Sequence, residues 1–404
     1  MSHQQLLARL ARTSDRKIVL LVLDGVGDLR SEAQPRTALD RARLPNLDAL
    51  AARSALGRIV PVAPGITPGS GPGHLALFGY DPRLPEADIG RGVLEALGLG
   101  LDISADTVAV RGNFATADAE GRLVDRRAGR IPTEECRRLC AILNEALGAA
   151  DLPAEVHPGE AHRFVLLLSD EDLSAEILDT DPQRLEVPPL EPTATSDRAD
   201  ATVALVRRVV ATMENAIRDE PRANRVLLRG FSKLPDLPQL GELHRARFGA
   251  FAGYPLYRGV AGACGMEVVP CGKQIEEIIA SVAEAWDRFD YFFLHVKQTD
   301  QAGEDGDLDA KVAVLERVDA ALPTLLELGP DVVAVTGDHS TPAPMRAHSW
   351  HPVPLLVAAE RCFVDPETEF TEVAATRGHL GTFPSYQLMG LLLANAGRLA
   401  KYGA

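Results

Sequence analysis

The chain has 404 residues, more than one ordinary hydrophobic core holds, so two domains or one domain with an insertion are expected. Hydrophobic residues make up 46% of the sequence and charged residues 25%, as in soluble globular proteins. The formal net charge of −15 argues against a nucleic-acid-binding protein, which needs a basic surface. It leaves room for an anionic substrate, because a bound metal ion inverts the local field.

The amino-terminal segment is polar and basic and lacks the apolar core of a secretory signal. No uninterrupted apolar run approaches the length of a membrane span. The five cysteines include no CxxC pair, and an odd number without a signal indicates free thiols in a reducing compartment. We therefore expect a cytoplasmic protein that binds no membrane. Cys136 and Cys140, on a predicted helix, are expected to pack on one helix face rather than hold a metal.

The first predicted strand is the apolar run 17–23, which ends abruptly at Asp24. An unbroken run of leucine and β-branched residues is typical of a strand buried on both faces of a parallel sheet. A helix is predicted over 47–56, followed by a loop rich in Gly and Pro at 62–73. The apolar stretch 74–78 then indicates the start of another helix.

The middle of the chain has a different character, with many charges at 111–130. Its predicted elements are strands at 164–168 and 226–228, a helix at 201–217 and an exposed connection rich in Pro and Thr at 185–197. We predict a smaller α/β or α+β domain over 107–257, inserted into a larger α/β domain made of 1–106 and 258–404.

The carboxyl-terminal part repeats the buried-strand pattern at 291–296, 332–336 and 353–358. An amphipathic helix lies between the first two runs, because apolar residues there recur at spacings of three and four. These residues are Leu308, Val312, Leu315, Val318, Leu322 and Leu325. Pro323 is expected to kink the last turn of this helix.

Three of the predicted strands are followed by acidic residues, namely Asp24, Asp300 and Asp338 with His339. Ligands of open parallel sheets lie beyond the carboxyl ends of the strands, so these side chains are expected at one edge. Carboxylates gathered there repel one another unless a cation neutralises them. The pattern predicts one or two divalent metal ions, with His348 as a further imidazole ligand. Mixed Asp/His ligation favours Mn²⁺ or Zn²⁺ over Ca²⁺.

Each of these residues also has a simpler explanation. A single Asp after a strand is more often a turn former or a helix cap than a metal ligand. A lone His348 is more often a surface or packing residue. The joint pattern is what favours a metal centre.

Ser70 is the candidate nucleophile, within the segment TPGSGPGH at 67–74. A helix that begins just after Ser70 would direct free N–H groups and a positive dipole at its hydroxyl. A metal ion on the oxygen would make the serine reactive near neutral pH. Composition alone favours the simpler alternative, a flexible Gly/Pro turn with an incidental serine.

The chain resembles the archaeal-type cofactor-independent phosphoglycerate mutases of the alkaline-phosphatase superfamily. The matching stretches run in family order over nearly the whole chain. They are VLDGVGD (22–28), PGSGPGHLALFGYDP (68–82), GRGVLEALGLGLD (90–102), RGNFATAD (111–118), VDRRAGRI (124–131), DTDP (179–182), HVKQTDQAGEDGD (295–307), TGDHSTP (336–342) and HSWHPVPLLV (348–357).

The resemblance implies an alkaline-phosphatase-like sheet sandwiched by helices, a smaller inserted domain and two metal sites. One site would use Asp24, Ser70, Asp338 and His339, and the other Asp300, Glu304 and His348. Three positions depart from the family pattern. Glu304 stands where a histidine is expected, Gly71 where an acidic residue is common, and His351 where a carboxylate is expected. Glutamate still binds a metal through oxygen, which favours Mn²⁺ or Mg²⁺ over Zn²⁺; the alternative is a weakened or lost site.

Basic residues in the middle domain suit the substrate that the resemblance implies. Arginine recognises phosphate and carboxylate with paired N–H groups, and phosphoglycerate carries both. The candidate substrate-binding residues are Asn113, Asp125, Arg126, Arg130 and Lys297. For each arginine, a solvated charged turn is the alternative. Lys297 is equally a candidate structural partner for nearby carboxylates, and Asp125 is a candidate acid or base.

The implied function is that of an isomerase of glycolysis and gluconeogenesis. It interconverts 3-phosphoglycerate and 2-phosphoglycerate through a phosphoserine intermediate on Ser70. The expected cofactors are two divalent ions, Mn²⁺ first, with Mg²⁺, Zn²⁺ or Co²⁺ as alternatives. The expected partner is a small phosphorylated carboxylate, with no nucleic acid and no membrane, and a homo-oligomer is left open. Two alternatives remain: a related metal-dependent phosphatase or kinase-like phosphotransferase, and a non-catalytic protein with a degenerate metal site.

Overall fold

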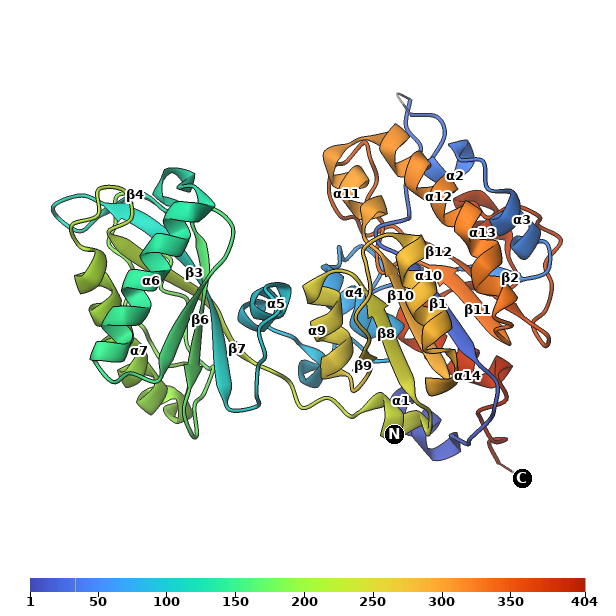
Figure 1. Ribbon diagram of the computed structural model, residues 1–404, viewed down its shortest axis with the longest axis horizontal. Coiled ribbons are helices and arrows are strands. Elements are labelled where there is room, and N and C mark those ends of the chain that lie inside the picture. The colour runs from blue at the N-terminus through green and yellow to red at the C-terminus, as the bar shows by residue number, and fades with distance from the viewer. Residues whose placement is uncertain (33, 404) are drawn as a thin grey trace. The chain divides into compact units, whose positions relative to one another are not determined.

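The computed structural model describes residues 1–32 and 34–403, which form two compact units (Figure 1). The first unit comprises Met1–Asp88 and Leu237–Ala404, and the second is the inserted segment Ile89–Asp236. Both unit boundaries therefore lie earlier in the chain than the predicted 106/107 and 257/258. The boundary near 88 precedes helix α5 (Arg91–Gly98), because this helix packs on strands of the inserted unit. The boundary near 236 precedes strand β8 (Phe248–Ala252), because this strand pairs with a strand of the first unit.

The first unit contains an 8-stranded sheet in the order β13-β2-β12-β11-β1-β10-β8-β9. Its other strands are β1 (Ile18–Leu23), β2 (Ala55–Val60), β9 (Glu267–Val268), β10 (Tyr291–Val296), β11 (Val332–Thr336), β12 (Val353–Ala359) and β13 (Gly381–Pro384). Strand β1 is parallel to both of its neighbours, β10 and β11. Strand β12 is antiparallel to β11 and β2. The apolar runs predicted as strands at 17–23, 291–296, 332–336 and 353–358 correspond to β1, β10, β11 and β12.

Helices cover both faces of this sheet, which explains why every residue of β1, β10 and β11 is buried. The helices are α1 (His3–Leu10), α2 (Ala38–Arg41), α3 (Pro45–Ala51), α4 (Ser70–Leu77), α8 (Leu240–His244), α9 (Pro255–Ala263), α10 (Ile275–Glu284), α11 (Gln298–Asp305), α12 (Leu308–Glu327), α13 (Glu372–Arg377) and α14 (Leu388–Asn395). The crossovers through α10 and α12 run in one direction along the sheet and that through α9 in the other. Right-handed crossovers therefore place α9 on one face and α10 with α12 on the opposite face (Figure 1).

Two predicted helix boundaries are wrong. The helix predicted over 47–56 ends at Ala51, and Leu56 belongs to β2. Ser54 separates the two elements, because its hydroxyl donates to the carbonyl of Leu50 and closes the helix. The helix predicted from 74 begins at Ser70, because Pro72 is tolerated in a first turn. Helix α12 continues through Pro323 to Glu327.

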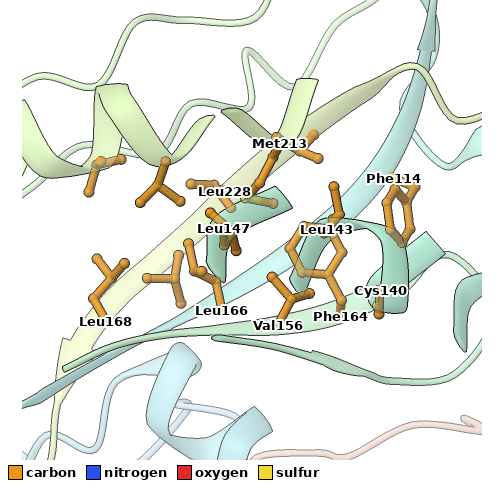
Figure 2. Packing of buried hydrophobic residues seen from close by; sticks show 14 of the residues in the cluster. Phe114, Cys140, Leu143, Leu147, Val156, Phe164, Leu166, Leu168, Met213 and Leu228 are labelled. Carbon is orange, nitrogen blue, oxygen red and sulfur yellow. The ribbon is translucent and has the colours of Figure 1, made fainter. Parts of the chain in front are cut away.

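The inserted unit is an α+β domain with a 5-stranded antiparallel sheet. Its strands are β3 (Thr107–Ala117), β4 (Leu123–Asp125), β5 (Ala154–Pro158), β6 (Arg163–Ser169) and β7 (Arg225–Lys233), and its longer helices are α6 (Thr133–Ala149) and α7 (Asp200–Ile217). Side chains such as Leu143, Met213 and Phe164 fill the space between these two helices and the sheet (Figure 2). Cys136 and Cys140 are buried in this core, as the sequence predicts.

None of the helices in the described ranges combines the length and the apolar character that a bilayer crossing requires.

Candidate metal centre and anion pocket

The candidate metal centre lies at the carboxyl ends of three adjacent parallel strands of the first unit. Strand β1 ends immediately before Asp24, β10 before Lys297 and β11 two residues before Asp338. The side chains of Asp24, Asp300 and Asp338 are fully buried. The sheet register thus brings together the carboxylates that the sequence places after separate strands.

A first group consists of Asp24, Asp338 and His339, whose ligand atoms all lie within 4.8 Å of one another. His339 Nε2 lies 3.4 Å from Asp24 Oδ1 and 3.1 Å from Asp338 Oδ2. Ser70 Oγ lies 3.4 Å from the same nitrogen. Ser70 is the first residue of α4, so the helix presents its hydroxyl to this group at the positive end of the helix dipole.

The donor set of the first group fits a divalent cation. Asp24 Oδ1 and Asp338 Oδ2 are buried and accept no hydrogen bond from the described residues, which is costly for carboxylate oxygens unless a cation binds them. His339 Nδ1–H donates to Thr341 Oγ1 over 3.0 Å, and this hydroxyl donates to Asp300 Oδ1 over 2.5 Å. The lone pair of His339 Nε2 therefore faces the two carboxylates, as metal ligation requires.

A second group consists of Asp300, His339 and His348. His348 Nδ1–H donates to the carbonyl of Pro68 over 3.0 Å, which leaves Nε2 free, 3.5 Å from Asp300 Oδ1. The rings of His348 and His339 stack with centroids 3.6 Å apart. Asp300 and His348 thus meet as the sequence predicts, and His339 is the third member of this group.

Glu304 lies at the margin of the second group. Its Oε1 is 3.7 Å from His348 Nε2, and its side chain is 52% exposed. The two other departures from the family pattern lie outside both groups: Gly71 is buried in the first turn of α4, and His351 contacts Ser349.

Lys297 lies between the carboxylates of the two groups. Its ammonium donates to Asp300 Oδ2 over 2.6 Å and lies 3.3 Å from Asp24 Oδ2. Burial lowers the pKa of Lys297, but the charges of Asp24 and Asp300 outweigh burial and raise it, so the side chain stays protonated. Burial likewise opposes ionisation of Asp24, yet the hydrogen bond from His295 and the charge of Lys297 hold its pKa well below the usual range.

Several residues that support the site have no recognised signal in the sequence. His295 Nε2–H donates to Asp24 Oδ2 over 2.9 Å, and the ring of Tyr257 stacks on His295 at 3.7 Å. Burial first, and then the charge of Asp24, raises the pKa of Tyr257. His74 Nδ1–H donates to the carbonyl of Ser70 over 2.8 Å. A histidine within an otherwise apolar buried strand was the available clue to His295.

Lys311 of α12 forms hydrogen bonds with the two loops that carry the candidate metal ligands Asp24, Asp338 and His339. It is fully buried, and its ammonium donates to the carbonyls of Gly25, Gly27 and Thr341 at 2.9, 3.3 and 2.9 Å. All three of its protons are therefore satisfied by the loops after β1 and β11.

The inserted unit contains a basic cavity of about 370 Å³, the anion pocket. It is lined by Arg111, Asn113, Arg126, Arg127, Arg130, Glu160, Ala161, His162, Arg163 and Arg229. Three predicted substrate-binding residues, Asn113, Arg126 and Arg130, line it. Asp125 does not, because its carboxylate accepts the backbone N–H groups of Arg127 and Gly129, both over 2.7 Å. Asp125 therefore closes the loop that carries the arginines.

The pocket is strongly electropositive although the chain is acidic. Burial, together with the charges of Arg163 and Arg127, lowers the pKa of His162 to about 4. The paired N–H groups of arginine guanidinium groups that converge on a cavity suit a phosphate or carboxylate group.

Comparison with known proteins places the chain in a family. The family model described as 2,3-bisphosphoglycerate-independent phosphoglycerate mutase matches residues 51–223. A probable 2,3-bisphosphoglycerate-independent phosphoglycerate mutase from Thermus thermophilus is 49% identical over 402 residues, covering 98% of each chain. Another, from Thermotoga neapolitana, is 45% identical over 405 residues and covers 100% of each. The chain belongs to this family of phosphoglycerate mutases.

Solved structures agree with this phosphoglycerate mutase assignment. A cofactor-independent phosphoglycerate mutase from Thermoplasma acidophilum matches with a TM-score of 0.76 at 30% identity, covering 95% of this chain and 100% of that one. A protein from Pyrococcus horikoshii matches with a TM-score of 0.79 at 27% identity, covering 97% and 100%. The predicted fold, an α/β unit with helices on both faces and a smaller insertion, is confirmed.

Proposed function

We propose that this chain is an isomerase that interconverts 3-phosphoglycerate and 2-phosphoglycerate with two divalent cations and with Ser70 as the phosphoryl acceptor. One observation carries the proposal: Ser70 Oγ, at a helix N-terminus, lies 3.4 Å from His339 Nε2. The same nitrogen lies 3.4 and 3.1 Å from two buried carboxylate oxygens that have no hydrogen-bond donor among the described residues. Membership of the phosphoglycerate mutase family supports the choice of substrate.

Two sets of residues would hold the cations. Asp24, Asp338 and His339 with Ser70 form the first set, and Asp300 and His348, with Glu304 at the margin, form the second. When bound, such ions lower the pKa of a hydroxyl and neutralise charge on phosphoryl oxygens. Mixed carboxylate and imidazole donors favour Mn²⁺, with Mg²⁺, Zn²⁺ and Co²⁺ as alternatives.

The chain's own residues then perform the transfer. Ser70 Oγ forms a bond to phosphorus as the bond from phosphorus to the 3-oxygen of glycerate breaks, which leaves phosphoserine and bound glycerate. The hydroxyl proton of Ser70 ends on this 3-oxygen. The 2-oxygen of glycerate then takes the phosphoryl group, and the proton of its hydroxyl returns to Ser70 Oγ. The ammonium of Lys297 and the unused N–H groups at the start of α4 stabilise charge on the transferring oxygens.

The anion pocket of the inserted unit supplies groups that recognise a small phosphorylated carboxylate. Arg127, Arg130 and Arg163 have no acidic partner within 4.0 Å among the described residues, so their N–H groups are available to a ligand. We extend the proposal to the compartment: the free cysteines fit a cytoplasmic enzyme.

The test is ³¹P NMR of the purified protein with 3-phosphoglycerate and Mn²⁺, without bisphosphoglycerate. Appearance of the 2-phosphoglycerate resonance, and its loss in Ser70→Ala, is the expected result. Release of inorganic phosphate alone would identify a phosphatase instead. No reaction with any of the four cations, from a protein that shows no Mn²⁺ binding, would indicate a degenerate site.

A further inference from the structure

The segment Asp179–Asp181 of the inserted unit lies against the arginines of the anion pocket. Thr180 fixes it to β7: its N–H donates to the carbonyl of Leu228 over 2.9 Å, and its hydroxyl accepts the N–H of Leu228 over 2.8 Å. Asp179 and Asp181, on either side of this anchor, are thereby held at fixed positions next to β7.

Asp181 accepts hydrogen bonds from one pocket arginine, Arg126, at both of its carboxylate oxygens. Arg126 Nε donates to Oδ1 over 2.7 Å, and Arg126 Nη2 donates to Oδ2 over 2.6 Å. The N–H of Gln183 also donates to Oδ1, over 2.9 Å. The side chain of Asp181 is fully buried. A bidentate contact with a buried carboxylate fixes both the position and the plane of the guanidinium.

A second pocket arginine lies between the two aspartates. Arg229 Nε donates to Asp179 Oδ2 over 3.4 Å, and its Nη1 lies 3.6 Å from Asp181 Oδ2. Asp179 is itself held in place, because its Oδ1 accepts the N–H of Gly230 over 2.7 Å. One short segment therefore supplies carboxylates to two of the six arginines that line the pocket.

We propose that Asp181, assisted by Asp179, is a positioning residue of the anion pocket. It orients Arg126 and Arg229 so that their remaining N–H groups meet a bound phosphate or carboxylate, while the unpaired arginines keep both edges of their guanidinium groups for the ligand. The inference rests on the proposed function. An arginine that is already ordered loses less conformational entropy when the ligand binds, so the arrangement strengthens binding although its carboxylates are negative.

Positioning and charge predict opposite effects of Asp181 on the affinity of the pocket for an anion. Asp181→Asn removes one negative charge beside the pocket, and charge alone would then tighten the binding of an anion. Loss of the two hydrogen bonds that orient Arg126 would instead weaken the binding of the anion. Glu160→Gln is the matched control, because exposed Glu160 lines the same pocket and forms no ion pair with an arginine among the described residues.

We expect Asp181→Asn to raise KM for 3-phosphoglycerate at least tenfold, with a smaller change in kcat. We expect Glu160→Gln to lower KM, because it removes a negative charge from the pocket without releasing an arginine. If both variants lower KM to the same extent, Asp181 acts only through its charge and the proposal is wrong. Circular dichroism of each variant verifies that the fold is intact before the kinetics are compared.

A measurement without turnover separates this inference from the proposed function. In the full chain, phenylglyoxal labelling followed by peptide mass spectrometry reports how fast each arginine reacts. We expect Asp181→Asn to accelerate labelling of Arg126 several-fold relative to Arg130, and Asp179→Asn to accelerate labelling of Arg229 only. Asp179→Asn also serves as the second variant should Asp181→Asn fail to fold. Unchanged labelling in a folded variant overturns the positioning role, whether or not the wild type has mutase activity.

Discussion

His295 Nε2 lies 2.9 Å from Asp24 Oδ2, and both side chains are fully buried. Because burial lowers the pKa of His295, the ring is neutral and its single N–H orients the carboxylate. The other oxygen of Asp24 is thereby directed toward His339 and the first ligand group. A buried strand histidine thus sets the direction of a candidate metal ligand.

We predict that His295→Ala weakens Mn²⁺ binding by about 10- to 100-fold, the usual effect of removing a residue that orients a metal ligand. Electron paramagnetic resonance of free Mn²⁺ during a titration measures the change. His379→Ala, an exposed histidine whose ring stacks on Phe363, is the control. Equal Mn²⁺ affinity in both variants would contradict the role assigned to His295.

Removal of divalent ions should lower the stability of the protein. Without the ions, the buried oxygens of Asp24 and Asp338 that accept no hydrogen bond within the described part of the chain would lose their cation. A ligand present at a hundredfold excess over Kd stabilises a fold by about 2.7 kcal/mol. Thermal unfolding after treatment with EDTA, with and without added Mn²⁺, should show a rise in Tm on addition of the ion. Asp24→Asn with Asp338→Asn should abolish that rise.

The identity of residue 304 should control metal preference. Glu304 offers a hard oxygen 3.7 Å from His348 Nε2. Glu304→His replaces it with an imidazole, a softer ligand that suits Zn²⁺ better than Mg²⁺ or Mn²⁺. Competition titrations should therefore show a shift in affinity from Mn²⁺ toward Zn²⁺. Glu304→Gln controls for loss of charge, and an identical shift in that variant would rule out a ligand effect.

Gly25 should tolerate no side chain. Its φ is +61°, and an added Cβ would lie 2.4 Å from Thr341 Oγ1 and 2.7 Å from Asp300 Oδ1. Gly65 is the control, because its φ is +81° and no atom lies within 4 Å of an added Cβ. Gly65→Ala therefore measures only the free-energy cost of a left-handed backbone for alanine, about 1–2 kcal/mol. Urea unfolding should show a clearly larger loss of stability for Gly25→Ala than for Gly65→Ala. Similar losses would mean that the turn after β1 adjusts freely.

The stability of the inserted unit should depend on pH through His162. The folded-state pKa of about 4 lies below the unfolded value of about 6.5, so the folded state binds fewer protons between these values. The contribution of His162 to stability is therefore present above pH 6.5 and is lost as the pH falls toward 4. Unfolding at pH 7.5 and pH 5 should differ less in His162→Gln than in the wild type. An equal difference would exclude this contribution.

The sequence predicts well the strands that carry the candidate metal ligands, because continuous apolar runs are typical of buried parallel strands. Strands β10 and β11 have the predicted bounds, and their neighbour β1 begins one residue later than predicted. The residues after them then follow from topology alone. Strand β8 escaped prediction because FGAFA is short and three of its five residues are small, a composition that a loop also has. The boundary predicted at 257/258 differs from the observed one for the same reason.

Side-chain roles were harder to predict than positions. Asp125 sits among arginines in the sequence, yet its oxygens are taken by backbone N–H groups of its own loop, a local contact that composition does not reveal. Asp181 contacts Arg126, which lies 55 positions earlier in the sequence, so no local pattern could pair them. His339 belongs to both groups, and its ring stacks on that of His348, a tertiary contact that the sequence does not reveal.

The hydroxyl of Thr341 accepts a hydrogen bond from His339 and donates its only proton to Asp300. A change in the charge on Asp300 alters how strongly that proton is held, and hence the basicity of the imidazole that serves the neighbouring group. If both candidate groups hold cations, as proposed, the two positions would therefore be thermodynamically coupled rather than independent. Filling one position would then change the affinity of the other, so the response to cation concentration would differ from that of two separate sites.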